Sequence, residues 1–113
     1  MECIFCKIAA GELPAKKVFE SEHVVAFEDI HKVAPVHVLV IPKVHRQSLL
    51  EVNPNDVDLL SGVQEAIRAV IKDTGIEQTG FRVITNSGAA AGQTVFHLHF
   101  HVIGGRELAM TLA

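Results

Sequence analysis

The sequence predicts an α+β fold, a five-stranded, mostly antiparallel sheet with one long helix and one short N-terminal helix. One long stretch repeats its apolar residues at steps of three and four, as a helix with one buried face does. Shorter stretches rich in β-branched and apolar residues are separated by Gly, Pro, Asn and Asp, as strands are separated by turns. A long helix inserted among five strands suggests two packed layers, and 113 residues suit a single domain, 1–113.

A short helix and three strands are expected before Pro42. The helix ends near Gly11, and Pro42 stops the third strand, whose β-branched residues indicate burial. In order, these elements are the helix 4–10, the strands Lys16–Phe19 and His23–Glu28, the loop Asp29–Pro35 and the strand His37–Ile41.

The long helix is expected between Asn53 and Gly75. Asn53 suits the N-cap, Pro54 suits the first helical position, and Gly75 lies just past the end. The apolar stripe expected to face the sheet comprises Val57, Leu60, Val63, Ile67, Val70 and Ile71, while Asp58, Glu65, Arg68 and Lys72 take the outer face.

Two further strands, Phe81–Thr85 and Val95–Ile103, are expected to pair directly with each other. Their connection, Asn86–Thr94, is rich in glycine and alanine between Gly88 and Gly92. Small residues let backbone N–H groups approach a phosphate closely, so this loop is a candidate anion-binding loop. An ordinary flexible hairpin is the alternative.

Charge and hydropathy argue against nucleic-acid-binding and membrane proteins. The net charge is −3, and acidic and basic residues are interspersed, so no basic stripe indicates binding to nucleic acid or to an acidic membrane. No apolar run approaches the roughly 20 residues of a membrane span, and the N-terminus lacks the pattern of a signal peptide. We therefore expect a soluble, cytoplasmic protein.

Three histidines, His97, His99 and His101, alternate with apolar residues near the C-terminus. On a strand, side chains two apart share a face, so the three imidazoles would line up on one face. Crowding disfavours their protonation, and histidine has an ordinary pKa near 6.5, so the row should be largely neutral at pH 7. Neutral imidazole is what a nucleophile, a general base or a metal ligand requires.

Cys3 and Cys6 form a C-x-x-C pair. A disulfide between them would close too short a loop to staple the fold. A redox-active pair normally opens a helix after a strand, and no strand precedes this one. A metal clip is the favoured interpretation, provided that histidines elsewhere complete it.

The segment His97-Leu98-His99-Phe100-His101-Val102 resembles the His-φ-His-φ-His-φ-φ signature of the histidine-triad (HIT) superfamily, where φ is apolar. The resemblance spans nearly the whole chain. Its Gly-Gln-Thr-Val and Gly-Gly-Arg segments resemble the Hint branch of nucleotide-binding proteins more than the Fhit dinucleotide-hydrolase branch. The segments that carry it are also Cys3–Ile8, Ala26–Ile30, His37–Lys43, Asn86–Gly88, Gly92–Phe96 and Gly104–Arg106.

The resemblance implies a purine nucleoside phosphoramidase, which hydrolyses the P–N bond of nucleoside 5′-phosphoramidates, such as adducts of AMP with amines or lysine. By position, His99 matches the nucleophile that forms a nucleotidyl-histidine intermediate, and His101 matches the histidine that contacts the phosphate oxygens. Thr94 stands where the family usually carries serine, whose hydroxyl binds the phosphate or the leaving group. The family's homodimers, with both sheets joined into one, imply a homodimer here.

The same resemblance implies binding residues for a purine nucleotide. Asn86 and Gln93 match positions near the phosphate, Asp29 matches the acceptor of the ribose hydroxyls, and Phe27, Ile30 and Ile8 match the apolar walls of the base pocket.

A structural zinc ion is implied as well. Some bacterial members of the family hold zinc with a C-x-x-C pair, a later histidine and the first triad histidine, which correspond here to Cys3, Cys6, His45 and His97. Members without the cysteines need no metal, so no catalytic metal is implied. His37 matches a family histidine near the triad, in a hydrogen-bonding role.

Three alternatives remain open at this stage. The protein could be a dinucleoside polyphosphate hydrolase of the same superfamily. It could be a metal-dependent hydrolase in which His97 and His99 join a third histidine around a catalytic zinc ion. It could also be a nucleotide-binding regulatory protein whose catalysis is incidental.

Overall fold

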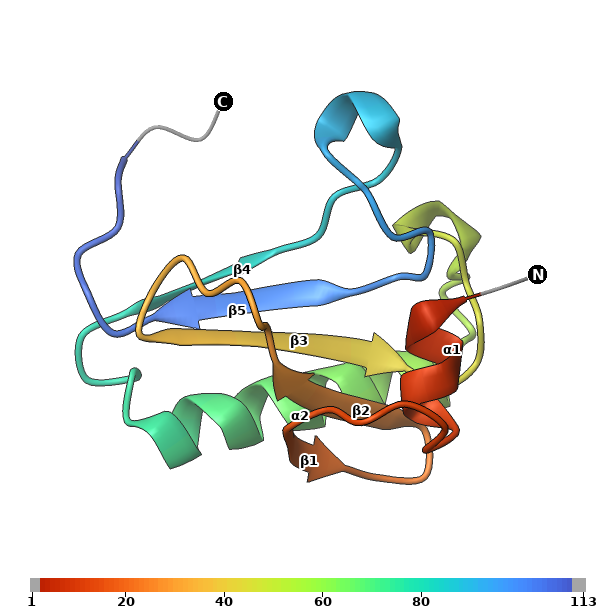
Figure 1. Ribbon diagram of the computed structural model, residues 1–113, viewed down its shortest axis with the longest axis horizontal. Coiled ribbons are helices and arrows are strands. Elements are labelled where there is room, and N and C mark those ends of the chain that lie inside the picture. The colour runs from red at the N-terminus through yellow and green to blue at the C-terminus, as the bar shows by residue number, and fades with distance from the viewer. Residues whose placement is uncertain (1–2, 111–113) are drawn as a thin grey trace.

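A computed structural model describes residues 3–110 (Figure 1). It contains the predicted five-stranded sheet with one long and one short helix, which confirms the fold class. The helices are α1 (Ile4–Ala9) and α2 (Val57–Thr74), with short 3₁₀ turns at Leu49–Glu51 (η1) and Ala89–Ala91 (η2). The strands are β1 (Lys17–Glu20), β2 (Val24–Glu28), β3 (Val36–Pro42), β4 (Phe81–Ile84) and β5 (Phe100–Gly104).

The sheet is antiparallel throughout, in the order β1-β2-β3-β5-β4. The predicted pairing of the last two strands is therefore confirmed. Because β5 lies between β3 and β4, His101 stands opposite Leu39 on one side and Ile84 on the other. The third triad histidine thus sits within the sheet rather than at an edge.

The two faces of the sheet are covered unequally. Helix α2 runs along one face of the sheet (Figure 1). Its apolar side chains pack with Leu98 and Val102 in the larger core cluster. Helix α1 packs through Phe5 and Ile8 on the opposite face, and it covers only one end of it. Because strand side chains alternate, the apolar residues of the triad segment face α2 and its histidines face the partly open side.

The start of the long helix differs from the prediction. Asn53 and Pro54 were expected to begin it, but the helix starts at Val57 with Asp56 as its N-cap. The carboxylate of Asp56 accepts a hydrogen bond from the Asn53 backbone N–H at 2.8 Å. The backbone N–H of Asp56 in turn donates to the Asn53 carbonyl, 2.9 Å away, which closes a turn just before the helix. Gly75 ends the helix in a left-handed conformation, as expected.

The buried stripe of α2 is also rotated from the predicted one. Val57 and Leu60, expected to face the sheet, are 64% and 39% exposed, and Leu59 is buried instead. The helix is rotated because it approaches the sheet closely at Gly62, where a Cβ atom would come within 3.1 Å of Val24. A glycine carries little hydropathy signal, so the sequence pattern did not mark this face as buried. The predicted polar face is exposed as expected. Among residues 3–110, neither helix combines the length and apolarity that crossing a membrane requires.

The last strand is shorter than predicted. It was expected from Val95 to Ile103 but begins at Phe100. Before that point the chain is held by other contacts, because the Leu98 N–H donates to the Arg46 carbonyl at 2.7 Å and the Thr85 hydroxyl donates to the His99 carbonyl at 2.8 Å. His97 and His99 therefore precede the ladder, in a segment that keeps the alternation of faces.

The rotated stripe leads to a prediction about stability. Leu59 is 6% exposed in the core under the sheet, so we expect Leu59→Ala to lower the free energy of unfolding by about 2–4 kcal/mol. Leu50, 91% exposed, is a matched control, and Leu50→Ala should change it by less than about 0.5 kcal/mol. Urea unfolding followed by circular dichroism measures both. Equal effects would contradict the placement of α2.

Candidate active site and metal cluster

The three triad histidines occupy three different environments. His97 is fully buried, His99 is 7% exposed, and His101 is partly buried. The ring of Phe5, from α1, packs edge-on against His97 and His99 with centroid distances of 6.0 and 5.2 Å. The His99 and His101 rings are themselves 5.1 Å apart. Helix α1 thus packs against His97 and His99. His101 lies toward the part of the sheet face that α1 does not cover.

A backbone hydrogen bond fixes the tautomer of His99. Its Nδ1 lies 2.8 Å from the His97 carbonyl oxygen, which can only accept, so Nδ1 carries the proton. In a neutral ring the other nitrogen, Nε2, then has a free lone pair. His99 can therefore act as a nucleophile or as a base through Nε2.

His101 is fixed in the opposite tautomer by a chain of two hydrogen bonds. The Val33 backbone N–H donates to Nδ1 of His37 at 3.1 Å, so the proton of a neutral His37 ring is on Nε2. That Nε2–H lies 2.9 Å from Nδ1 of His101 and donates to it. His101 must then carry its own proton on Nε2. His99 offers a lone pair and His101 offers an N–H, from rings in contact.

Burial lowers the pKa of His37, His97 and His101 and so favours their neutral form at pH 7. Desolvation lowers the pKa of His101 to about 4, helped by the neighbouring His99 and His37. Desolvation also lowers the pKa of His37 below its usual range, against the opposing effect of the Asp29 carboxylate. The pKa of His97 is lowered mainly by its burial. The expectation of a largely neutral cluster agrees with these directions.

Four predicted nucleotide-binding residues line one cavity. Ile8, Phe27, Asp29 and Ile30 come from α1, β2 and the loop after β2, and they surround a space of about 580 Å³. Most of its remaining lining is apolar, from Ile4, Phe5, Leu13, Pro14, Ala15 and Leu39, with Lys16, Glu28 and Lys32 at the same cavity. Its size and apolar walls suit a flat heterocycle.

Asp29 is held at the edge of this cavity. Its Oδ1 accepts from the His31 N–H at 2.8 Å, and its Oδ2 lies 3.3 Å from Nε2 of His37. A carboxylate has about four lone-pair sites, so hydroxyl groups of a ligand can still donate to it. Asp29 thus connects the apolar cavity to the histidines.

The predicted phosphate loop is closed by its own glutamine. Gln93 is 4% exposed, and its side-chain oxygen accepts from the Gly88 N–H at 2.8 Å. Its amide nitrogen donates to the carbonyls of Gln47 and Val95, at 2.6 and 3.1 Å. The side chain of Gln93 is therefore engaged in shaping the loop. Asn86 is half-buried at the start of the loop, between β4 and η2.

Thr94 is exposed and lies at a second cavity of about 520 Å³. Val95 and Phe96 line this cavity next to it, and α1 contributes Ile4 and Lys7. Ile4 and Leu13 line both cavities, so the two spaces are neighbours. Thr94 thus lies away from the apolar cavity that holds Asp29.

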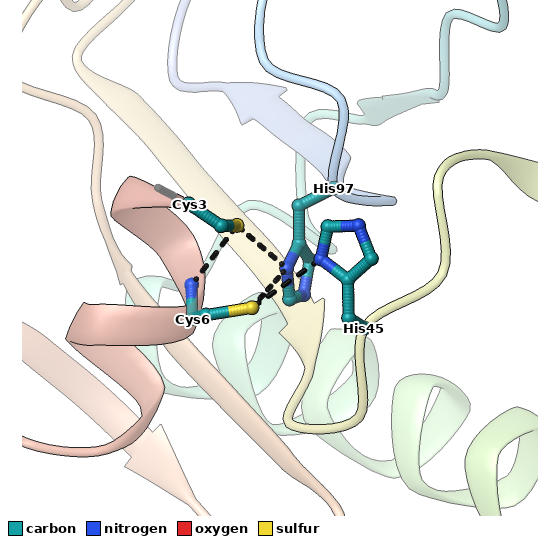
Figure 2. Close-up of side chains that lie close together, drawn as sticks. All are labelled: Cys3, Cys6, His45 and His97. Atoms are coloured by element: carbon teal, nitrogen blue, oxygen red, sulfur yellow. Dashed lines mark hydrogen bonds between the residues drawn. The ribbon is translucent and has the colours of Figure 1, made fainter. Parts of the chain in front are cut away.

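The four predicted metal ligands converge at one point. Cys3 and Cys6 come from the start of α1, His45 from the loop after β3, and His97 from the triad (Figure 2). Their ligand atoms all lie within 4.8 Å of one another. Sulfur-to-nitrogen distances are 3.3 Å from Cys3 to His97, 3.3 Å from Cys6 to His45 and 3.5 Å from Cys6 to His97. A tetrahedral zinc site with these ligands has S–N separations of about 3.5 Å.

The local chemistry of the cluster also suits a cation. Nε2 of His97 donates to the Pro42 carbonyl at 2.8 Å, so Nδ1 turns a lone pair toward both sulfur atoms. Burial and the adjacent Cys3 raise the pKa of the Cys6 thiol to about 11, because a second thiolate is unfavourable here without a cation. The residues therefore fit a thiolate–imidazole metal site.

A second group of potential ligands, Asp29, His37 and His101, also lies within 4.8 Å. Here the Val33 N–H occupies Nδ1 of His37, so Nε2 carries a proton and has no lone pair for a metal ion. Both groups meet the same distance limit, but the cysteine-containing one has the lone pair of His97 Nδ1 directed toward its sulfur atoms.

Known proteins share the fold of this chain and are similar to it in sequence. A sequence model of the family described as "Scavenger mRNA decapping enzyme C-term binding" matches residues 2–111. A solved structure named "HIT family hydrolase from Clostridium thermocellum" superposes with a TM-score of 0.94 at 46% identity, covering 99% of this chain and 97% of that one. The chain belongs to the histidine-triad (HIT) family.

Two other HIT relatives show the breadth of the similarity. "Protein HitA" of Neisseria gonorrhoeae is 45% identical over 102 residues, which cover 90% of this chain and 94% of that protein. The structure of a "histidine triad nucleotide-binding protein from Candida albicans" is 31% identical with a TM-score of 0.82, covering 99% of this chain and 87% of that one. The family predicted from the histidine motif is therefore confirmed, and membership of the Hint branch stays a prediction.

Sequence reasoning missed the backbone groups of this HIT site. The carbonyls of Pro42 and His97 and the N–H of Val33 set the tautomers of three rings. Backbone groups are the same at every non-proline position, so no side-chain pattern marks which of them meets a ring. Phe5, which packs against the rings of His97 and His99, was given no role by the sequence analysis beyond lying in the segment Cys3–Ile8 that resembles the family.

The lowered pKa of His101 leads to a prediction about pH. Between about pH 6.5 and pH 4 the unfolded chain binds a proton at this residue and the folded chain does not, so stability falls as the pH falls. Between pH 7 and pH 5 the loss from His101 should be at most about 2 kcal/mol. Urea unfolding with metal chelated should therefore show a smaller loss for His101→Gln than for the wild type. Identical pH dependence in the two proteins would contradict the assignment.

Proposed function

We propose that this HIT protein is a nucleotide hydrolase of the phosphoramidase class, cleaving the P–N bond of purine nucleoside 5′-phosphoramidates through His99. The observation that carries the proposal is the pair of opposed tautomers. Nε2 of His99 has a free lone pair, while the adjacent His101 carries an N–H. A nucleophile and a hydrogen-bond donor side by side are what attack on a phosphoryl group requires.

The reaction would run in two steps. Nε2 of His99 attacks phosphorus, the P–N bond breaks, and its electron pair leaves with the amine nitrogen, which takes up a proton from water. The Nε2–H of His101 donates to a phosphoryl oxygen as negative charge grows there. Water then attacks phosphorus, the P–Nε2 bond breaks with its electron pair on Nε2, and the attacking water releases a proton that replaces the one taken up by the amine. The nucleoside monophosphate leaves a neutral His99. The His97 carbonyl accepts the Nδ1–H throughout and stabilises the ring while it carries positive charge.

The nucleoside portion fits the cavity of about 580 Å³ beside the histidines. The rings of Phe27 and the side chains of Ile8 and Ile30 offer apolar walls for a purine, and Asp29 offers carboxylate oxygens for the ribose hydroxyls. Asn86 and Thr94 are proposed to contact the phosphate and the leaving group, and Gln93 to hold the loop that carries Thr94.

A second candidate is hydrolysis of dinucleoside polyphosphates. The neighbouring cavity of about 520 Å³ has room for a second nucleoside, and it is lined by Thr94, Val95 and Phe96. Rates on adenosine 5′-phosphoramidate and on a diadenosine polyphosphate, measured with the same protein, distinguish the two. Faster turnover of the polyphosphate would favour this candidate.

For the cluster of Cys3, Cys6, His45 and His97 we propose a structural zinc ion. Four protein ligands close a tetrahedral site and leave no position for water, which favours a structural over a catalytic role. The ion would join α1 to the triad segment and hold His97, whose carbonyl orients the nucleophile.

A homodimer is proposed to form along the exposed edge strand β4. Its Phe81 and Val83 are 46% and 40% exposed, and β4 has a paired neighbour on one side only. Between this strand and α2 lies a groove of about 410 Å³, to which Ile67 and Ile71 contribute. A second copy placed against this edge would cover the apolar side chains and the open backbone groups.

The covalent step can be tested directly. During turnover of adenosine 5′-phosphoramidate, acid- or base-quenched protein should carry an adenylyl group on His99, detected by mass spectrometry of peptides. His99→Asn should abolish the label and lower kcat by at least about 100-fold, because the covalent route is lost. A label on His101, or wild-type turnover by His99→Asn, would overturn the assignment.

Metal content tests the zinc proposal. Purified protein should contain about one zinc ion per chain by mass spectrometry of the elements, and His45→Gln should lose it. We expect the variant's Tm to fall, because the link from α1 to the triad segment is removed. His31→Gln changes an exposed histidine outside the cluster and should retain both zinc and Tm. Equal zinc content in the two variants would exclude His45 as a ligand.

Sedimentation tests the dimer. The wild type should sediment as a dimer at micromolar concentration, and Val83→Lys should shift it to a monomer because it places a charge in the joined edge. Val44→Lys introduces the same charge at a valine that is 49% exposed outside β4 and should leave the dimer intact. A monomeric wild type contradicts the proposal.

A further inference from the structure

Gly105 and Arg106, which follow β5, contact the loop of residues 29–35 that carries Asp29. Arg106, an exposed side chain, donates from Nη2 to the Val33 carbonyl at 2.8 Å and from Nη1 to the Glu107 carbonyl at 2.8 Å. Gly105, just before it, has φ of +94° and lies so close to the loop that a Cβ atom would come within 3.0 Å of Pro35. These contacts attach residues 29–35 to the end of β5.

The residue held by Arg106 is the one that sets the tautomer of His37. The carbonyl of Val33 accepts from Arg106, while its N–H donates to Nδ1 of His37 at 3.1 Å. His37 in turn donates to His101 at 2.9 Å. Arg106 is therefore linked through Val33 and His37 to His101, the histidine proposed to contact the phosphate.

The loss of this link has a defined chemical consequence. Without the Val33 N–H, only the Asp29 carboxylate, 3.3 Å from Nε2, still favours the proton of a neutral His37 on that nitrogen, so that part of the molecules can carry it on Nδ1 and turn a bare Nε2 toward His101. The proton of His101 would then move to Nδ1 to meet that lone pair, and its Nε2 would present a lone pair to the phosphate. An N–H that stabilises a phosphoryl oxygen would be replaced by a repulsive contact.

We propose that Arg106 is a positioning residue for the reaction, acting through Val33 to hold His37 and His101 in the tautomers that present an N–H to the phosphate. This inference rests on the proposed function of His99 and His101. Within residues 3–110, the side-chain hydrogen bonds of Arg106 go to the backbone carbonyls of Val33 and Glu107, so its effect reaches the substrate through other residues.

A second arginine in the same region offers a matched control. Arg82, on β4, donates to the Ala109 carbonyl at 2.7 Å and so holds the C-terminal segment without contacting the loop 29–35. Arg82→Ala removes the same charge and one backbone hydrogen bond. An effect of charge or of a loosened C-terminal segment would appear in both variants, whereas an effect through Val33 would appear only at Arg106.

The test compares the wild type, Arg106→Ala, Arg106→Lys and Arg82→Ala. Histidine ¹⁵N NMR of the protein without substrate reports which ring nitrogen of His37 is protonated. We expect Nε2–H in the wild type and in Arg82→Ala, and a mixture of both tautomers in Arg106→Ala. Lysine can reach the Val33 carbonyl with one N–H, so Arg106→Lys should restore most of the wild-type signal.

Kinetics on adenosine 5′-phosphoramidate complete the test. Arg106→Ala should lower kcat by about 10-fold or more, because a donor to the phosphoryl group is lost in part of the molecules. Arg106→Lys should recover most of this loss, and Arg82→Ala should stay within about 2-fold of the wild type, as expected for a surface change. An unchanged His37 tautomer in Arg106→Ala overturns the inference, as does an equal fall of kcat in Arg82→Ala. A wild type without turnover would instead defeat the proposed function, while the NMR comparison would still decide the role of Arg106.

Discussion

Backbone hydrogen bonds decide what each buried histidine of this protein can do. A neutral imidazole has one proton and two nitrogens, so fixing one nitrogen fixes the other. The His97 carbonyl accepts a hydrogen bond from the Nδ1–H of His99, and the Pro42 carbonyl accepts one from the Nε2–H of His97. The Val33 N–H acts in the opposite sense, because it occupies a lone pair of His37. The main chain thus decides which ring nitrogens offer a lone pair and which offer an N–H.

His97 links the two chemical centres. Its ring turns toward Cys3 and Cys6, while its carbonyl holds the proton of His99. Whatever holds the ring of His97 in place therefore also holds the carbonyl that orients the ring of His99. Because of this coupling, the zinc ion proposed for the cluster of Cys3, Cys6, His45 and His97 would also stabilise the orientation of His99.

The unequal covering of the sheet explains why the site lies where it does. Helix α2 seals one face with an apolar core, so the side chains directed to that face have no access to a ligand. Helix α1 covers only the end of the other face, where it closes the cysteine–histidine cluster and lines the apolar cavity at Asp29. The short helix thus serves both centres with different residues, Cys3 and Cys6 for one and Phe5 and Ile8 for the other.

The local sequence pattern predicted which helices and strands form better than it predicted the residues at which they begin and end. The helix end at Gly75 was correct because a left-handed glycine is a local signal, whereas the start at Val57 depended on the carboxylate of Asp56 reaching back to Asn53. The stripe of α2 was misjudged because Gly62 decides how closely the helix approaches Val24. The strand expected from Val95 was shortened by contacts from Arg46 and Thr85, which are distant in sequence.

The sequence by itself determined the fold class, the family and the alternation that turns the histidines to one face and Leu98 and Val102 to the other. These follow from periodicity and from motifs, which are properties of neighbouring residues. Only the tertiary structure decided which nitrogen of each ring holds the proton, and which of the two compact clusters can accept a cation. Those outcomes depend on single backbone donors and acceptors brought in by the loops around β3, and a backbone group has no identity in the sequence until the fold places it beside a ring.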